Sequence, residues 1–156
     1  MILRIRSLRW PQDREAVLSF QRETYESNFP GLVVTPDFLQ EYATLLRRAA
    51  GHPQEGLFVL DDGERAQGFV WVGVTSTLVD PWCGYIKNLY VVPERRRQGW
   101  ARRLLEHAER WLASRGVSRV ELDCTVGNEG ARGLYESVGY RTCRYRMVKS
   151  CGGEEG

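Results

Sequence analysis

The segment from residue 85 to residue 126 restricts the fold more than any other part of the chain. Residues 85–92 are mostly apolar and are followed by Pro93, which cannot donate to a sheet ladder, so they predict a strand. A helix is expected after them as far as Ser114, and another strand at residues 120–126. Because two strands joined through a helix favour a parallel crossover, this segment predicts two parallel strands with a helix packed on their sheet.

The expected helix is amphipathic. Its apolar residues recur at helical spacing and predict one buried stripe, formed by Ala101, Leu104, Leu105, Ala108, Trp111 and Leu112. Arg102 and Glu106 stand four positions apart on the opposite face, where such pairs support a helix. Arg102, Arg103 and Arg110 are therefore explained as parts of a solvated face.

Three further arginines, Arg95 to Arg97, have no such explanation. They are expected in the first turn of the helix, where aligned peptide dipoles already amount to about half a positive charge. Gly99 follows within a short turn, and free backbone N–H groups at a strand–glycine–helix junction bind anions. The segment therefore predicts a site for an anion such as a diphosphate, although it matches neither the Walker P-loop nor G-x-G-x-x-G.

The remaining elements follow from alternation, helical spacing and turn residues. Further strands are expected at residues 2–8, 56–60, 68–74 and 140–148, and further helices at residues 12–25, 36–49 and 129–138. The order along the chain is then β-α-α-β-β-β-α-β-α-β. Because short turns imply antiparallel pairing, the predicted class is a mixed α/β (α+β) fold with a mainly antiparallel sheet flanked by helices.

Length and charge favour a single domain. The chain has 156 residues and a net charge of +2, and we assign one compact domain to residues 1–150 and a mobile tail to residues 151–156. The small charge gives no general reason to bind nucleic acid, and no apolar run of roughly 18 residues exists that could cross a membrane. The N-terminal residues alternate between apolar and basic types, which does not resemble a signal peptide.

The cysteines and histidines do not form a metal-binding pattern. The four cysteines include no C-x-x-C pair and the chain has only two histidines, so no metal is expected. A chain of this length does not need disulfides, and we expect a reduced, cytoplasmic protein in which most cysteines are small core residues. Cys124 is expected in the core rather than as a nucleophile, and His107 is expected to be exposed.

Two motifs in the second half of the chain resemble those of the GCN5-related N-acetyltransferases. Residues 96–101, R-R-Q-G-W-A, match the R/Q-x-x-G-x-G/A signature of that family. Residues 128–140 match N-x-x-A-x-x-x-Y-x-x-x-G-F except for a tyrosine at the last position. The short signature alone is weak, but two motifs in this order and at this separation are specific. The resemblance covers residues 85–148, and before it only the order of elements agrees.

The resemblance implies an enzyme that transfers the acetyl group of acetyl-CoA to a primary amine by direct attack in a ternary complex. It implies that the strand bulges around residues 89–91 and parts from residues 120–126, so that the central parallel strands are splayed and the pantetheine lies between them. Backbone N–H groups of residues 97–102 would hold the diphosphate. An N–H near Val91 would polarise the thioester carbonyl, which is typically worth about 3 kcal/mol. The residues implied in cofactor binding are Leu89, Tyr90, Val91, Arg96, Arg97, Gln98, Gly99, Trp100, Ala101, Arg102, Asn128, Ala131 and Tyr135.

The resemblance also implies two catalytic residues. Tyr135 stands where relatives keep the tyrosine that protonates the departing thiolate, although a helix-face tyrosine can equally be a core residue. Many relatives carry a glutamate where this chain has Lys87, and a cation cannot take up a proton. Asp123 is the replacement candidate, because a glutamate lies five residues before the motif asparagine in some ribosomal-protein N-acetyltransferases. A structural role for Asp123 and a water chain as the base remain alternatives, and Asn128 would bind pantetheine, cap a helix, or do both.

The sequence leaves the amine acceptor open. A protein N-terminus, a lysine side chain, a polyamine, an aminoglycoside and an amino acid all remain candidates. Residues that line the acceptor site or else pack in the core are Tyr25, Asn28, Phe29, Trp71, Trp82 and Tyr85. A homodimer through the last strands is also left open.

Two other classes of protein compete with the enzyme. A CoA-binding sensor or interaction protein without catalysis is the main alternative, because Lys87 replaces an acid. A nucleic-acid binder that uses the arginines is less favoured, because the chain has no aromatic stacking pattern and little net charge.

Overall fold

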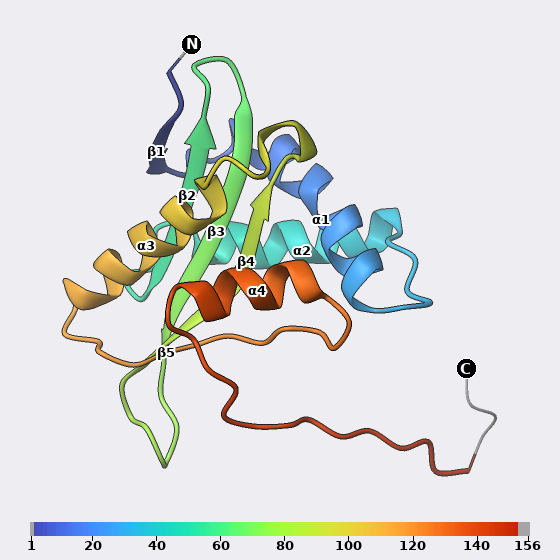
Figure 1. Ribbon diagram of the computed structural model, residues 1–156. Helices are drawn as coiled ribbons and strands as arrows, with labels where there is room; N and C mark the ends of the chain where they lie inside the picture. The colour runs from blue at the N-terminus through green and yellow to red at the C-terminus, as the bar shows by residue number, and fades with distance from the viewer. Residues whose placement is uncertain (1, 153–156) are drawn as a thin grey trace.

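The structure is a computed structural model that describes residues 2–152 of the chain. Its strands form one five-stranded sheet in the order β1-β2-β3-β4-β5 (Figure 1). In chain order the elements are β1 (Arg4–Ser7), α1 (Arg14–Asn28), α2 (Pro36–Ala49), β2 (Glu55–Asp61), β3 (Ala66–Thr75), β4 (Cys83–Val91), the short 3-10 helix η1 (Pro93–Arg95), α3 (Trp100–Ala113), β5 (Val120–Glu121) and α4 (Glu129–Ser137).

The sheet is mixed and mainly antiparallel, as the sequence predicts. Strands β1 to β4 pair antiparallel with their neighbours in the chain, whereas β4 and β5 run parallel on either side of the α3 crossover. Helices α1 and α2 cover one face of the sheet and α3 covers the other (Figure 1). The predicted fold class is therefore confirmed.

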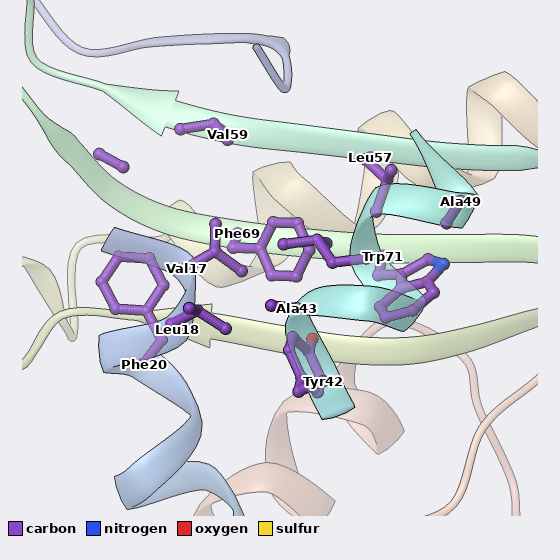
Figure 2. Close-up of a cluster of buried hydrophobic side chains, with 12 residues drawn as sticks. Val17, Leu18, Phe20, Tyr42, Ala43, Ala49, Leu57, Val59, Phe69 and Trp71 are labelled. Atoms are coloured by element: carbon purple, nitrogen blue, oxygen red, sulfur yellow. The ribbon is translucent and has the colours of Figure 1, made fainter. Parts of the chain in front are cut away.

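Each face of the sheet carries its own hydrophobic cluster. On one face Val17 of α1 and Tyr42 of α2 pack with Phe69 and Trp71 of β3 (Figure 2). On the other face the predicted stripe of α3 packs on β2, β3 and β4, and its fully buried members are Leu104, Leu105, Ala108 and Leu112. Full burial of one leucine side chain contributes about 2 kcal/mol, so this stripe fixes where α3 begins over the sheet.

Two helix ends show how local sequence sets the geometry of the site. α2 begins as predicted, because Thr35 Oγ1 accepts a hydrogen bond from Phe38 N at 3.1 Å and Pro36 needs no N–H partner in the first turn. α1 continues to Asn28 instead of ending at residue 25, and Pro30 follows soon after, where it disfavours helical geometry in Phe29. The longer α1 carries Asn28 to the end of the sheet where α4 begins.

The last predicted strand is the main difference between sequence and structure. Residues 141–152 have no regular secondary structure, and their large side chains Tyr145, Met147 and Val148 are exposed. The predicted strand at residues 120–126 is also short, because only Val120 and Glu121 pair with β4. Without a longer β5 the C-terminal residues have no strand to pair with, although their alternation suits one. A homodimer through these residues stays a prediction, and most of the predicted tail lies outside the described residues.

The cysteines are mostly on the surface, contrary to the sequence-based expectation. Cys83 is buried, whereas Cys124, Cys143 and Cys151 are exposed and all four are free. Three of the four therefore lie outside the core. Within residues 2–152, no helix combines the length and apolar character needed to cross a membrane.

Candidate active site

The loop between β4 and α3 presents a row of backbone N–H groups. After η1 the chain passes through Arg97 at φ 62° and Gly99 at φ 85°, and α3 starts only at Trp100. The first i to i−4 backbone hydrogen bond of α3 is donated by Arg103 N to Gly99 O, at 3.1 Å. The N–H groups of residues 97–102 precede this bond, so they are available to an anion. This loop, residues 96–102, is called the anion loop below.

Arg95 ends η1, and Arg96 and Arg97 lie in the loop that follows, so none of the three is in the first turn of α3 and that part of the prediction is wrong. Arg96 is held by the protein, since its Nε donates to Val91 O at 2.8 Å. The guanidinium of Arg103 lies 4.8 Å from the centre of the Trp100 ring. Gly99, in the left-handed conformation, is the N-cap of α3 and lets the N–H groups on either side of it converge on one side. α3 therefore begins after Arg95, Arg96 and Arg97, whereas Arg102 and Arg103 belong to its first turn.

A gap opens between β4 and the chain that follows β5. The two strands pair only at Gly84 with Val120 and at Tyr85 with Glu121. Beyond these pairs β4 continues toward η1, while the chain after β5 runs beneath α4 (Figure 1). The predicted parting of the central parallel strands is thus present.

The edge of β4 that borders this gap carries backbone groups which β3 does not use. Val92 N donates to Gln67 O at 2.9 Å on the β3 side. Because successive residues of a strand alternate in direction, the N–H and C=O of Val91 point the other way, toward the gap. The N–H that the sequence analysis assigns to the thioester carbonyl therefore faces the gap.

The bulge of β4 lies earlier in the strand than predicted. Trp71 of β3 faces Asn88, but the next residue, Val72, faces Ile86, so Lys87 is the extra residue. The ladder shows no shift at residues 89–91, where the sequence analysis places the bulge. The bulge carries Lys87 to the α1–α2 face of the sheet, where its Nζ lies 2.6 Å from Glu55 Oε1.

Tyr135 lies on α4 beside the gap. Burial raises the pKa of its hydroxyl to about 12, and the nearby Cys124 thiol adds to this rise. Its ring packs with Tyr140 and with the α3-side cluster, so the expected core contact is present. Among residues 2–152, however, none forms a hydrogen bond with its hydroxyl, which stays protonated at neutral pH and free to donate.

Asn128 caps α4 and joins it to α1. Its Oδ1 accepts from Ala131 N at 3.2 Å, which confirms the predicted cap. Its Nδ2 donates to Asn28 Oδ1 at 3.3 Å. Thr125 Oγ1 donates to Asn28 O, also at 3.3 Å, so the end of α1 is tied to the chain just before α4.

Asp123 forms a pair that the sequence did not reveal. The Tyr85 hydroxyl donates a hydrogen bond to Asp123 Oδ2. Burial raises the pKa of Tyr85 above its ordinary value, and the Asp123 carboxylate raises it further. The pair connects β4 with the segment after β5 directly across the start of the gap. A carboxylate in contact with a neutral phenol can accept a proton from a nearby amine, either directly or through the hydroxyl.

A model of the Acetyltransferase (GNAT) family matches residues 14–140 of this chain. The chain belongs to this family. It is 32% identical to the ribosomal protein bS18-alanine N-acetyltransferase of Escherichia coli strain K12 over 109 residues, or 64% of this chain and 72% of that protein. It is 38% identical to N-alpha-acetyltransferase 30 of Schizosaccharomyces pombe over 117 residues, or 74% of this chain and 77% of that protein.

The GNAT fold extends over nearly the whole chain. A crystal structure of a predicted acetyltransferase from Clostridium acetobutylicum with acetyl-CoA is similar to it with a TM-score of 0.79 and 14% identity, covering 96% of each chain. The family recognised from the two motifs is confirmed, and this GNAT protein is an acyltransferase.

Other candidate residues of this GNAT protein lie in two different places. Tyr25 and Phe29 belong to a group of aromatic rings on the α1–α2 side that also includes Tyr42 and Trp71. Trp82 lies apart in the β3–β4 turn, where its Nε1 donates to Arg115 O at 3.1 Å.

Two expectations about single residues are wrong. His107 is only partly exposed, because its ring packs against Phe58 with centroids 4.4 Å apart, and this burial lowers its pKa. Cys124 is exposed and lies close to Tyr135, because the chain after Glu121 leaves the sheet before it reaches the core.

Proposed function

We propose that this GNAT protein transfers the acetyl group of acetyl-CoA to the α-amine of a protein N-terminus. The observation that carries the proposal is the placement of Asp123 and Tyr135. Asp123 contacts Tyr85, on the β4 face that also carries Lys87, while Tyr135 packs with the α3-side cluster near Cys124. Asp123 and Cys124 are neighbours in the chain and point to opposite faces. Asp123, the proposed base, and Tyr135, the proposed acid beside Cys124, therefore flank the gap from its two sides.

The acceptor class is supported by two relatives. One is named for acetylating an alanine of ribosomal protein bS18, and the other is named as an N-alpha-acetyltransferase. The exposed ring of Phe29, which stacks on Tyr25 with centroids 5.8 Å apart, offers an apolar surface on the same side of the sheet as Asp123. An α-amine suits this site chemically. Its pKa is about 8, so its ammonium form holds only weakly the one proton that it must lose before it attacks the thioester.

The chain also has groups that fit acetyl-CoA. N–H groups of the anion loop would hold the diphosphate, and the β4 edge at Leu89 would pair with the pantetheine arm. The acetyl-CoA in the Clostridium acetobutylicum structure, which shares this fold, supports this assignment. The N–H of Val91 would then polarise the thioester carbonyl, as the sequence analysis expects.

The proton transfers follow from these positions. Asp123 takes one proton from the ammonium group, directly or through the Tyr85 hydroxyl, and the neutral amine then attacks the thioester carbonyl carbon. As the new C–N bond forms, the C–S bond breaks and its electron pair leaves with sulfur. Tyr135 donates its proton to the departing thiolate, and the amine loses its second proton to water. The products are an N-acetyl amide and free CoA.

The direct test is an acetyl-CoA thiol-release assay with a panel of acceptors. The panel contains short peptides with free N-termini, the same peptides with blocked N-termini and one lysine, a polyamine and an aminoglycoside. Peptides with free N-termini are expected to drive CoA release, and Asp123→Asn and Tyr135→Phe are expected to lose it while still binding acetyl-CoA. Faster release with the lysine peptide, the polyamine or the aminoglycoside would overturn the acceptor class. Binding of acetyl-CoA without turnover of any acceptor would overturn the transferase.

A further inference from the structure

Glu23 of α1 lies outside both sequence motifs, yet its carboxylate joins three parts of the protein. Its Oε1 accepts from the Tyr90 hydroxyl at 2.9 Å, and its Oε2 accepts from Arg96 at 2.7 Å. The Tyr90 ring stacks on Phe20 of α1 with centroids 4.6 Å apart, and the Arg96 guanidinium lies 5.3 Å from the centre of the same ring. One carboxylate thus connects α1, the end of β4 and the anion loop.

Arg96 is fixed from two sides. Its Nε donates to Val91 O on the gap side of β4, and its terminal nitrogen donates to Glu23. The side chain of Arg96 is 42% exposed, but both contacts are to the protein, so the guanidinium is held along β4 and is not a freely moving cation for a phosphate. Arg96 therefore affects anion binding by fixing its own backbone in the anion loop, and not by contacting the anion with its guanidinium.

The neighbouring backbone needs such a support. Arg97 has φ 62°, in the left-handed region that a residue with a Cβ rarely adopts. A residue keeps this conformation only where surrounding contacts hold it. Arg96 is the residue directly before it, and Gly99 at φ 85° follows, so the direction of the free N–H groups depends on how Arg96 is held.

We propose that Glu23 is a positioning residue for acetyl-CoA binding. Through Arg96 and Tyr90 it fixes the anion loop, so that the N–H groups of residues 97–102 point at one diphosphate. The inference rests on the proposed acetyl-CoA chemistry, but it concerns a residue on the helix that covers the opposite side of the sheet from α3. It also ties the cofactor loop to α1, whose last residue, Asn28, contacts Asn128.

The test compares Glu23→Ala with Glu15→Ala. Glu15 lies on the same helix and, within residues 2–152, pairs only with the adjacent Arg14, so it controls for the loss of a carboxylate from α1. Isothermal titration with acetyl-CoA is expected to give a dissociation constant about ten-fold higher for Glu23→Ala and unchanged for Glu15→Ala. The kcat at saturating acetyl-CoA is expected to stay within about two-fold, because Glu23 does not touch the reacting atoms.

A double-mutant comparison separates positioning from general loss of charge. Adding Arg96→Ala to Glu23→Ala is expected to weaken binding no further than Arg96→Ala alone, because both changes release the same loop. Fully additive effects would overturn the proposal, as would unchanged binding in Glu23→Ala. Tighter binding would also overturn it, since Glu23 would then compete with the diphosphate.

A second readout needs no acetyl-CoA. Trypsin cleaves after arginine in mobile segments, so cutting after Arg96 or Arg97 reports directly on the hold of the loop. Cleavage there is expected to be several-fold faster in Glu23→Ala than in wild type or Glu15→Ala, and equal rates would overturn the positioning role. If wild type does not bind acetyl-CoA, the proposed function fails, whereas the proteolysis result still decides whether Glu23 holds the loop.

Discussion

Removing the hydroxyl of Tyr135 should slow catalysis without weakening the fold. Within residues 2–152 this hydroxyl has no hydrogen-bond partner, so Tyr135→Phe loses no protein contact. The free energy of unfolding is therefore expected to change by less than about 0.5 kcal/mol. If the hydroxyl protonates the departing thiolate, kcat is expected to fall by about 10²- to 10⁴-fold, the usual range for a general acid.

Tyr140 provides the matched control. Its hydroxyl donates to Glu109 at 2.6 Å, and the two rings pack together, so both tyrosines share one environment. Tyr140→Phe loses a hydrogen bond to a charged group and is expected to reduce the free energy of unfolding by about 1.5 kcal/mol. Its kcat should remain near the wild-type value at a temperature where the variant is folded. Tyr135→Phe should thus lower kcat and leave the free energy of unfolding unchanged, whereas Tyr140→Phe should lower the free energy of unfolding and leave kcat unchanged.

The pH dependence gives a second measure of the same hydroxyl. Because burial raises the pKa of Tyr135 to about 12, only about 1% of it is ionised at pH 10, against half of an unperturbed tyrosine. The kcat of wild type should therefore rise as the acceptor amine loses its proton and stay level up to pH 10. Chemical denaturation measures the free energy of unfolding, and steady-state kinetics in a pH series measure kcat. A Tyr135→Phe enzyme with nearly normal kcat, or a wild-type kcat that falls before pH 10, would refute the reasoning.

Three other predictions concern proton transfer, stability and thiol reactivity. Asp123→Asn is expected to lower kcat/KM at pH 7 by about 10²-fold and to recover part of this loss as the pH rises above the pKa of the amine, measured in a pH series. Arg6→Met is expected to cost about 3 kcal/mol in urea denaturation, because Arg6 contacts Asp13 at 2.7 Å and Asp61 at 2.8 Å in a nearly buried cluster. Its guanidinium lowers the pKa of Asp61 from the ordinary value of 3.8. At Asp13 burial raises the pKa, but the hydrogen bonds from Arg6 and Arg9 together outweigh burial, so the pKa of Asp13 is also lowered. Wild type should therefore lose stability as the pH falls below about 3.8, and Arg6→Met should lose less. Three cysteines should react with a thiol reagent in the folded protein, and Cys83 should react only after unfolding, because burial raises its pKa to about 11; four rapid reactions would contradict this burial.

The sequence predicted the parts of the site that depend on short spacings. The turn through Gly99 into α3, the cap at Thr35, the cap at Asn128 and the buried stripe of α3 each follow from residues within a few positions of one another. Such features are set by local backbone geometry, so a periodic pattern or a motif is enough to find them.

Contacts between distant positions were not accessible in this way. Glu23 and Arg96 are 73 positions apart, and Tyr85 and Asp123 are 38 apart, so no spacing rule links them. Lys87 was considered only as a missing acid, but the structure gives it Glu55 of β2 as a partner across β3. The bulge itself was expected a few residues too late, because the register depends on how β3 and β4 pair.

The C-terminal segment shows a different limit. Its alternating residues have the pattern of a strand, but a strand also needs a partner, and β5 ends at Glu121. The position of Cys124 follows from the same early end of β5. The residue pattern alone therefore predicts that a segment can form a strand, while the presence of a neighbouring strand decides whether it does.

The most direct test of the proposed reaction is to locate the transferred acetyl group. Wild-type protein and acetyl-CoA are incubated with a peptide that has both a free N-terminus and an internal lysine, and fragment masses identify the modified nitrogen. The account predicts acetylation of the α-amine, dependent on enzyme and lost in Tyr135→Phe. Acetylation of the lysine alone, or an unmodified peptide beside enzyme that binds acetyl-CoA, would contradict it.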